Sequence, residues 1–179
     1  EAMLYTSGTL RKLGRVDNRD AFLDTYELER ERGITIFSKQ ARFSFCNMQI
    51  ILLDTPGHVD FSAEMERTLQ VLDYAILVIS GADGVQGHTR TLWRLLKRYH
   101  IPVFLFINKM DQAGTDRQKL LQELRESLNE NCIDFTSAKG EAFYDALAMC
   151  AEEAMNEFLN TNNIKEDTIS DLILSLIHI

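Results

Sequence analysis

Two short polar motifs follow apolar segments of this chain, and their residue types suit the binding of a nucleotide. The first is Leu53-Asp54-Thr55-Pro56-Gly57-His58. An aspartate at the end of a strand can hold Mg²⁺, usually through water, and a glycine lets a backbone N–H approach a phosphate oxygen. His58 projects into the same space. Taken alone, the motif is more simply interpreted as a tight turn that carries a surface histidine.

The second motif, Asn108-Lys109-Met110-Asp111, follows the apolar run Val103 to Ile107. Guanine presents an N1–H beside an exocyclic amino group, and one carboxylate can accept hydrogen bonds from both. Adenine lacks that pair of donors, so Asp111 would select guanine, while the Lys109 stem can lie along the base. A polar loop at a strand end is the alternative interpretation.

A third segment, Glu29 to Ile36, is rich in charge and contains Arg-Gly-Ile before Thr35. A threonine at the end of a mobile loop can close on Mg²⁺ and a γ-phosphate, and loss of the phosphate would release the loop as a switch. A solvated charge run entering a strand is the simpler alternative for this segment alone.

Alternating strands and helices are expected to position these motifs. The pattern predicts a helix that ends before Gly8, a long polar stretch to Thr35, and a hairpin that turns at Cys46-Asn47. Apolar periodicity then predicts helices over 62–72, 89–99, 116–129 and from about 136 to 159. Ala75 to Ile79 and Val103 to Ile107 read as strands buried on both faces. Met65, Leu69, Leu121, Leu124, Phe143, Leu147 and Met155 are expected to contribute to the core.

This order predicts an α/β fold of the doubly wound type, with a mostly parallel sheet and one antiparallel hairpin. Ligands of such folds bind at the carboxyl ends of the strands. Asp54 and Asn108 are separated by one expected strand and two helices, which places both motifs on the same rim of the sheet.

Composition narrows the possible classes of function. The 179 residues carry a formal net charge of -8, which disfavours a domain that grips nucleic acid by itself, and we expect no direct DNA binding. Cys46, Cys132 and Cys150 form no C-x-x-C pair and read as reduced cytosolic thiols. No apolar run is long enough for a membrane span.

The motifs Arg32-Gly-Ile-Thr35-Ile, Asp54-Thr-Pro-Gly-His58 and Asn108-Lys-Met-Asp111 together resemble the GTP-binding domain of the translational GTPases. The resemblance is to the elongation factor G branch and above all to the ribosomal protection proteins for tetracycline resistance. It covers about residues 1–130 well and the remainder loosely. We expect residues 1–135 to form the GTP-binding domain and 136–171 to be a helical insertion or a continuation of the same domain. The end, 172–179, departs from the family and reads as a buried strand or as an out-of-frame or artificially added end.

The resemblance implies a cytoplasmic GTPase of the P-loop type that uses GTP, GDP and Mg²⁺, works on the ribosome and does not enter membranes. It implies that Thr35 and Asp54 hold the metal and that His58 orients the attacking water. The guanine nucleotide is then contacted by Asp54, Thr55, Pro56, Gly57, His58, Asn108, Lys109, Met110 and Asp111.

No G-x-x-x-x-G-K-[ST] motif occurs in the 179 residues. We therefore expect a domain that lacks its first strand and phosphate loop, and weak GTP binding by this chain alone. Ser137-Ala138-Lys139 resembles the last guanine motif of the family, which otherwise lies beyond this sequence. Two alternatives stay open: a truncated, non-functional fragment without nucleotide binding, and a small signalling-type GTPase, which only the spacing to Ser137 supports.

Overall fold

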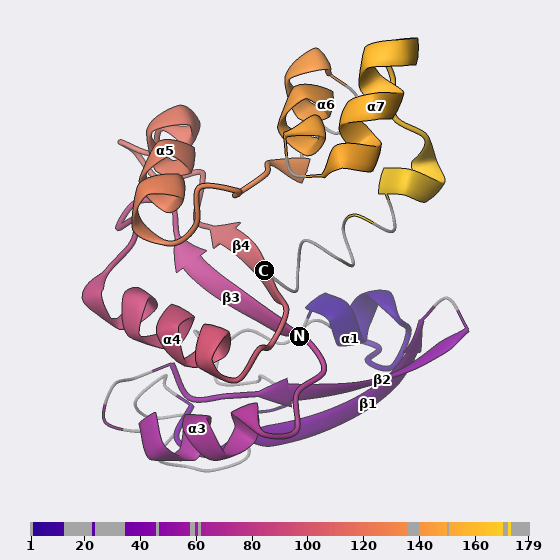
Figure 1. Cartoon of the computed structure of the whole chain (residues 1–179). Coiled ribbons are helices and arrows are strands. Elements are labelled where there is room, and N and C mark those ends of the chain that lie inside the picture. The colour runs from indigo at the N-terminus through magenta and orange to yellow at the C-terminus, as the bar shows by residue number, and fades with distance from the viewer. Residues whose placement is uncertain are drawn as a thin grey trace. The chain divides into compact units, whose positions relative to one another are not determined.

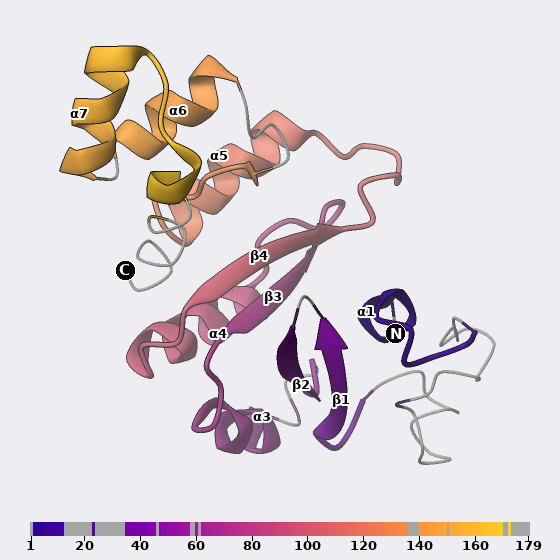
Figure 2. The ribbon, with the colours of Figure 1, turned by 90° about the vertical axis from the view of Figure 1, so that its right-hand side faces the viewer.

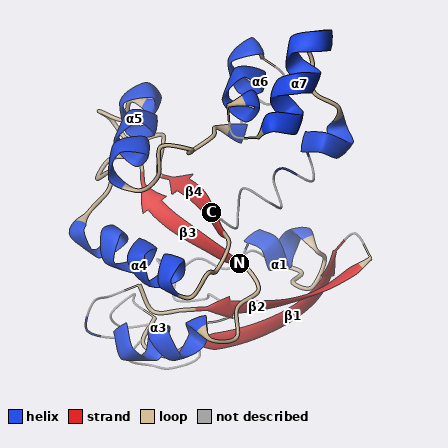
Figure 3. Cartoon of the chain, viewed as in Figure 1, coloured by secondary structure: helices blue, strands red, loops and turns tan. Residues whose placement is uncertain are grey.

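The computed structural model describes residues 2–12, 23, 35–45, 47–57, 60, 62–135, 140–149, 151–169 and 172. These residues form two compact units, one within Glu1–Val71 and the other within Leu72–Ile179. Helices and strands are shown in Figures 1 and 3, and each unit combines both kinds of element. The prediction of an α/β fold is therefore confirmed.

The first unit is built on a hairpin. Strands β1 (Lys39–Phe45) and β2 (Met48–Asp54) are antiparallel, with Phe45 opposite Met48. Asn47, in the turn, has a φ of 62°, a left-handed conformation that asparagine tolerates well. The hairpin and Asn47 in its turn follow the sequence prediction, while Cys46, the other residue of the predicted turn, lies outside the described residues.

Helix α1 (Ala2–Thr6) packs against this hairpin, as Figures 1 and 2 both show. Its fully buried Leu4 joins Ala41 and Phe43 of β1 in one apolar cluster. The helix stops before Gly8, which has a φ of 77°, a conformation that glycine adopts without a steric penalty. The predicted end of the helix is confirmed.

Helix α3 (Ser62–Leu69) completes the described part of the first unit. Met65 and Leu69, which were expected on one face, are both buried. The helix ends three residues earlier than predicted, and Leu72 belongs to the second unit.

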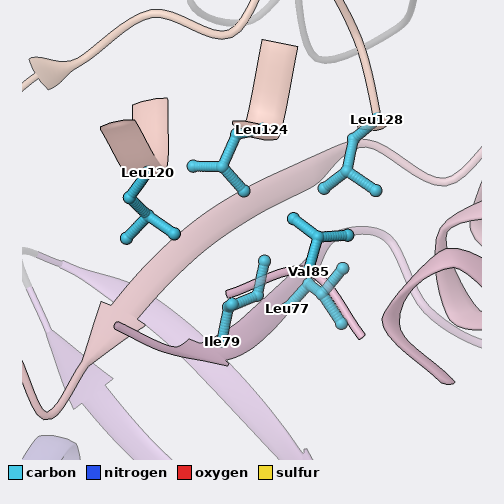
Figure 4. Packing of buried hydrophobic residues seen from close by; sticks show 6 residues of the cluster. All are labelled: Leu77, Ile79, Val85, Leu120, Leu124 and Leu128. Atoms are coloured by element: carbon cyan, nitrogen blue, oxygen red, sulfur yellow. The ribbon is translucent and has the colours of Figure 1, made fainter. Parts of the chain in front are cut away.

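The second unit contains the parallel strands β3 (Ala75–Ser80) and β4 (Val103–Asn108), joined by helix α4 (Gly87–Arg98). Helix α5 (Arg117–Ser127) follows β4. Figure 4 shows Leu120, Leu124 and Leu128 directed toward Leu77, Ile79 and Val85. Burying each of these side chains contributes about 1.5–3 kcal/mol, so this cluster holds the carboxyl end of β3 against α5.

Among the described residues, the β3–β4 side chains on one face, such as Leu77 and Ile79, are buried, whereas those on the other face are exposed, which differs from the prediction of strands buried on both faces. Ile76 lies opposite Phe104 and Val78 opposite Phe106 in the register, and Val78 and Phe106 are 59% and 57% exposed. An apolar run was taken to indicate two covered faces, but side-chain type alone does not reveal how many layers lie over a strand.

The sheet arrangement also differs from the prediction. Among the described residues the strands form two separate two-stranded sheets, of which β3–β4 is parallel and β1–β2 antiparallel. A single mostly parallel sheet is not present in this part of the chain. Periodicity located each strand correctly but carries no information on which edges pair.

Two further helices, α6 (Glu141–Ala148) and α7 (Glu152–Thr161), lie after Phe135, where the chain was expected to be helical to about Leu159. Phe143 and Leu147 are buried, as predicted, together with Ile164 and Leu172. Met155 is 38% exposed, and its neighbour Ala154 is fully buried instead. The break near Met149 rotates the start of α7 and so changes which side chain faces the cluster. No helix among the described residues has the length and apolar character needed to cross a membrane.

Candidate functional site

The Asn108–Asp111 motif begins at the carboxyl end of β4. In the parallel register Asn108 lies opposite Ser80, and the Gly81 backbone N–H donates to the Asn108 carbonyl over 2.8 Å. The two strands thus stay paired up to the first residue of the motif. The motif begins at a fixed point of the sheet, which is the position expected for a ligand-binding loop in an α/β fold.

The loop after Asn108 is closed by its own hydrogen bonds. Lys109 has a φ of 60°, and its carbonyl accepts from the Gln112 N–H over 3.2 Å. The Thr115 hydroxyl lies 2.9 Å from the Met110 carbonyl and 2.8 Å from that of Gln112. A non-glycine residue in the left-handed region is uncommon and marks a backbone shape imposed by its surroundings.

Helix α5 fixes the far end of this loop. The Asp116 carboxylate accepts hydrogen bonds from the backbone N–H groups of Gln118 and Lys119 over 3.0 and 3.2 Å. This is an N-cap, which satisfies two donors that the first turn of a helix leaves unpaired. The motif is therefore held between the end of β4 and the capped start of α5.

The side chains of the motif lie at the surface. Asn108, Lys109 and Asp111 are exposed, and Met110 is 38% exposed. The Met110 sulfur lies close to Gly81, where an added Cβ would approach it to 2.6 Å. The Asp111 carboxylate has no protein hydrogen-bond partner among the described residues, so its acceptor oxygens face solvent and are accessible to a ligand.

The Asp54–Gly57 motif lies in the first unit and begins at the last residue of β2. Asp54 is opposite Lys39 in the hairpin register and is partly buried, while Pro56 is buried and Gly57 exposed. A Cβ added to Gly57 would have no atom within 4 Å. The packing of the described residues therefore gives no steric reason for glycine at this position.

Thr35 precedes β1 in the same unit and is partly buried. Three residues later, the Ser38 hydroxyl lies 2.8 Å from the Thr68 hydroxyl, and Thr68 in turn donates to the Glu64 carbonyl of α3. The chain that leaves Thr35 is thereby tied to the helix that follows Asp54–Gly57. The segment that follows Thr35 is thus anchored to α3 through Ser38 and Thr68.

The oxygen-rich composition of this part of the site fits a hard cation. The Asp54 carboxylate and the Thr35 hydroxyl are both oxygen donors on partly exposed residues, and Mg²⁺ prefers oxygen ligands and retains several waters. The described residues contain no group of three or more His, Cys, Asp or Glu side chains arranged as a metal centre. A metal here would depend on water and phosphate oxygens for its remaining ligands.

The structure thus describes two halves of the predicted site, each with its own residues together: Asp54, Thr55, Pro56 and Gly57 in one unit, and Asn108, Lys109, Met110 and Asp111 in the other. His58 and Ser137-Ala138-Lys139 lie outside the described residues.

The sequence analysis did not identify the residues that shape the Asn108–Asp111 loop. Asp116 carried a usable signal, because an aspartate just before an amphipathic run is a typical N-cap. Thr115 and Gly81 carried none, because their roles depend on contacts with Met110 that periodicity does not reveal.

Comparison with known proteins shows the family of the chain. Residues 1–178 match the family model described as the elongation factor Tu GTP binding domain. Tetracycline resistance protein TetW of Butyrivibrio fibrisolvens is 47% identical over 133 residues, which is 74% of this chain and 21% of that protein. Tetracycline resistance protein TetO of Campylobacter jejuni is 36% identical over 176 residues, covering 92% of this chain and 28% of that protein.

A solved structure supports the fold. The crystal structure of ttk003000868 from Thermus thermophilus superposes with a TM-score of 0.83, covering 99% of this chain and 33% of that one, at 20% identity. The chain spans between about a fifth and just over a quarter of the length of the relatives it matches. The family match over nearly the whole chain, the fold and the two motifs lead to one conclusion: the chain belongs to the GTP-binding domain family of the translation factors, the family of the elongation factor Tu GTP binding domain.

Proposed function

We propose that the protein to which this chain belongs binds GTP and GDP and hydrolyses GTP as a ribosome-associated translation factor. The observation that carries the proposal is the Asn108–Asp111 loop. It begins at the carboxyl end of a parallel strand, is held by Thr115 and Asp116, and presents an Asp111 carboxylate that faces solvent. In this proposal Asp111 accepts from N1–H and the amino group of guanine, Asn108 braces the loop, and the Lys109 stem lies along the base.

The phosphate side of the proposal rests on Asp54–Gly57 and Thr35. Thr35 and Asp54 would hold Mg²⁺, Asp54 through water, and the Gly57 N–H would donate to the γ-phosphate. Open space around the Gly57 Cα, where an added Cβ would meet no atom within 4 Å, leaves room for a phosphate oxygen to approach this N–H. His58 would orient the attacking water, since catalysis of phosphoryl transfer depends mostly on positioning and electrostatics.

A complete site needs a phosphate cradle in addition. No Walker-type loop occurs in the 179 residues, so we infer that a strand and phosphate loop from elsewhere in the protein complete the site. We further propose that residues 1–135 carry the nucleotide site and that 136–171 form a helical insertion or a continuation of the same domain. The separate apolar cluster of α6 and α7 supports that division.

The relatives named above suggest where the protein acts. Their names refer to tetracycline resistance, and the family is that of a translation factor. We therefore propose the ribosome as the partner and the cytoplasm as the compartment. Translocation, tetracycline protection and recycling of release factors are the competing tasks within this function.

The proposal is tested by titrating a fluorescent GDP into two chains: the 179 residues alone, and the same residues preceded by the phosphate-loop segment of the TetW relative. We expect tight binding only by the extended chain. Asp111→Asn in that chain should weaken GDP binding by about a hundredfold or more, since hydrogen bonds to a charged acceptor contribute roughly 1.5–3 kcal/mol each.

The same variant gives a gain of function that misfolding cannot imitate. An asparagine can accept from N1–H of xanthine and donate to its 2-oxygen, so Asp111→Asn should prefer xanthosine diphosphate. Glu130→Gln, an equal charge change at an exposed position, should bind as the parent chain does. A folded extended chain that binds neither nucleotide would refute the proposed function.

A further inference from the structure

Helix α4 is positively charged, whereas the chain as a whole carries a net negative charge. The chain has 27 acidic and 19 basic residues, yet α4 (Gly87–Arg98) contains no aspartate or glutamate and four basic residues. These four, which are all exposed, define the α4 basic stripe: Arg90, Arg94, Lys97 and Arg98. Such a local concentration of positive charge can attract a polyanion despite the unfavourable net charge.

The spacing gathers the four side chains on one side of the helix. At about 100° per residue, Arg90, Arg94 and Arg98 follow one another around the helix, and Lys97 lies beside the row, so the stripe spans an arc of roughly 100°. The opposite side packs inward, with Leu96 buried and Leu92 and Trp93 against the main apolar cluster. Packing therefore fixes the direction in which the stripe points.

Ordinary structural roles account for only part of the stripe. The Arg90 guanidinium donates to the Ser127 hydroxyl of α5 over 3.3 Å, and Lys97 and Arg98, in the last turn, complement the helix dipole. Arg94 lies before the last turn. In the part of the chain that the structure describes, Arg94, Lys97 and Arg98 form no ion pair. At least three cations thus stay available to a partner.

We propose that the α4 basic stripe binds the phosphate backbone of ribosomal RNA. This inference rests on the proposed function, which brings the domain to the ribosome. A membrane surface fits poorly, because the apolar side of α4 is occupied by the core rather than free to enter lipid. A rigid row of exposed arginines suits phosphate groups, which accept from the planar guanidinium fork.

The test compares Arg94→Gln/Arg98→Gln with the parent chain in binding to a fluorescein-labelled RNA hairpin, measured by anisotropy across a range of salt concentrations. The matched control is Arg42→Gln/Lys119→Gln, which removes the same charge from exposed positions outside α4 that form no ion pair among the described residues. We expect the stripe variant to bind about tenfold more weakly at low salt. The slope of log K against log salt should become shallower by roughly 0.7–0.9 for each lost phosphate contact. The control should bind as the parent does, and circular dichroism checks that all three chains are folded.

The proposal would be overturned if the stripe variant bound RNA as tightly as the parent, or if the control variant lost as much RNA affinity as the stripe variant. Tighter binding of the parent to polyglutamate than to RNA would also overturn it and assign the stripe to an acidic protein. The GDP titration separates this inference from the function it rests on. If the stripe variant of the extended chain loses RNA binding but retains GDP binding, both proposals are supported. If the parent extended chain binds RNA but not GDP, the proposed role of the α4 basic stripe is retained and the proposed GTPase function is refuted.

Discussion

The Glu123 carboxylate of α5 accepts a hydrogen bond from the Val85 backbone N–H over 3.0 Å. This contact joins α5 to the loop between β3 and α4. It fixes that loop where Val85 enters the apolar cluster and Gly84 adopts a φ of 65°. Because the capped start of α5 also fixes the far end of the Asn108–Asp111 loop, one helix supports both loops that follow the parallel strands.

Replacing Glu123 by alanine is expected to destabilise the chain by about 1–2 kcal/mol, because the Val85 N–H loses a charged acceptor in a partly buried place. Glu123→Gln should retain most of the stability, since the amide oxygen still accepts. Urea unfolding measures both variants. Glu126→Ala, on the exposed side of α5, serves as the control and should change stability by no more than about 0.5 kcal/mol. If Glu123→Gln and Glu123→Ala lower the free energy of unfolding equally, the hydrogen bond does not hold the loop.

Gly57 and Gly84 are expected to respond in opposite ways to replacement by alanine. A Cβ at Gly84 would collide with the Glu123 carboxylate, and its positive φ disfavours any side chain. Gly84→Ala should therefore cost about 1–3 kcal/mol. Gly57 has open space and no positive φ, so Gly57→Ala should leave the free energy of unfolding within about 1 kcal/mol of the parent value.

The function of the extended chain should show the reverse pattern at Gly57. If its N–H meets a γ-phosphate, the added methyl group should slow single-turnover GTP hydrolysis while GDP binding stays near the parent value. Thermal melts and a hydrolysis assay on the same preparations measure the two effects. Unchanged hydrolysis by Gly57→Ala would remove this glycine from the proposed phosphate contacts.

Local patterns predicted the elements well. The hairpin around Asn47, the helix ending before Gly8 and the strands ending at Asp54 and Asn108 all depend on interactions between near neighbours, which leave a direct signal in the sequence. The two motifs therefore lie at strand ends as expected.

Features that depend on distant contacts could not be predicted in the same way. Both ring nitrogens of His88, near the start of α4, are buried without a hydrogen-bond partner among the described residues. Ile76 and Val78 were expected in a core and lie on an open face. In both cases the outcome depends on what packs over the residue, and periodicity within one segment does not contain that information.

Cys132 is expected to react slowly with alkylating reagents. Burial raises the pKa of its thiol, and this effect outweighs the hydrogen bond from the Asn129 backbone and the Arg125 charge, which lower it. Since the thiolate is the reactive form, iodoacetamide should modify Cys132 several-fold more slowly than a free cysteine near neutral pH. The rate should rise only at more alkaline pH.

The raised pKa of Cys132 also makes the stability of the folded chain depend on pH. The raised pKa of Cys132 contributes stability that is fully present below the pKa of the unfolded chain and is lost as pH rises through the folded value. A Cys46→Ser/Cys150→Ser chain isolates Cys132, and mass spectrometry follows its alkylation. Modification as fast as that of free cysteine would contradict the burial of this thiol.

Thr115 allows the shape of the proposed guanine loop to be tested separately from its chemistry. Its hydroxyl is within hydrogen-bond distance of the Met110 and Gln112 carbonyls, on the exposed side of the loop. Thr115→Val keeps the side-chain volume and removes this bond. Because the hydroxyl is exposed, stability should fall by only about 0.5–1 kcal/mol.

Nucleotide affinity should respond more clearly than stability to Thr115→Val. A loop that samples more conformations holds Asp111 in the binding geometry for a smaller fraction of the time, and apparent affinity falls with that fraction. We expect GDP binding by the extended chain to weaken about fivefold, as a loss of roughly 1 kcal/mol implies. Thr115→Ser keeps the hydroxyl and should bind as the parent does. If Val and Ser variants bind GDP equally well, the Thr115 hydroxyl does not preorganise the loop, and the positive φ of Lys109 must be maintained by the ends of β4 and α5 alone.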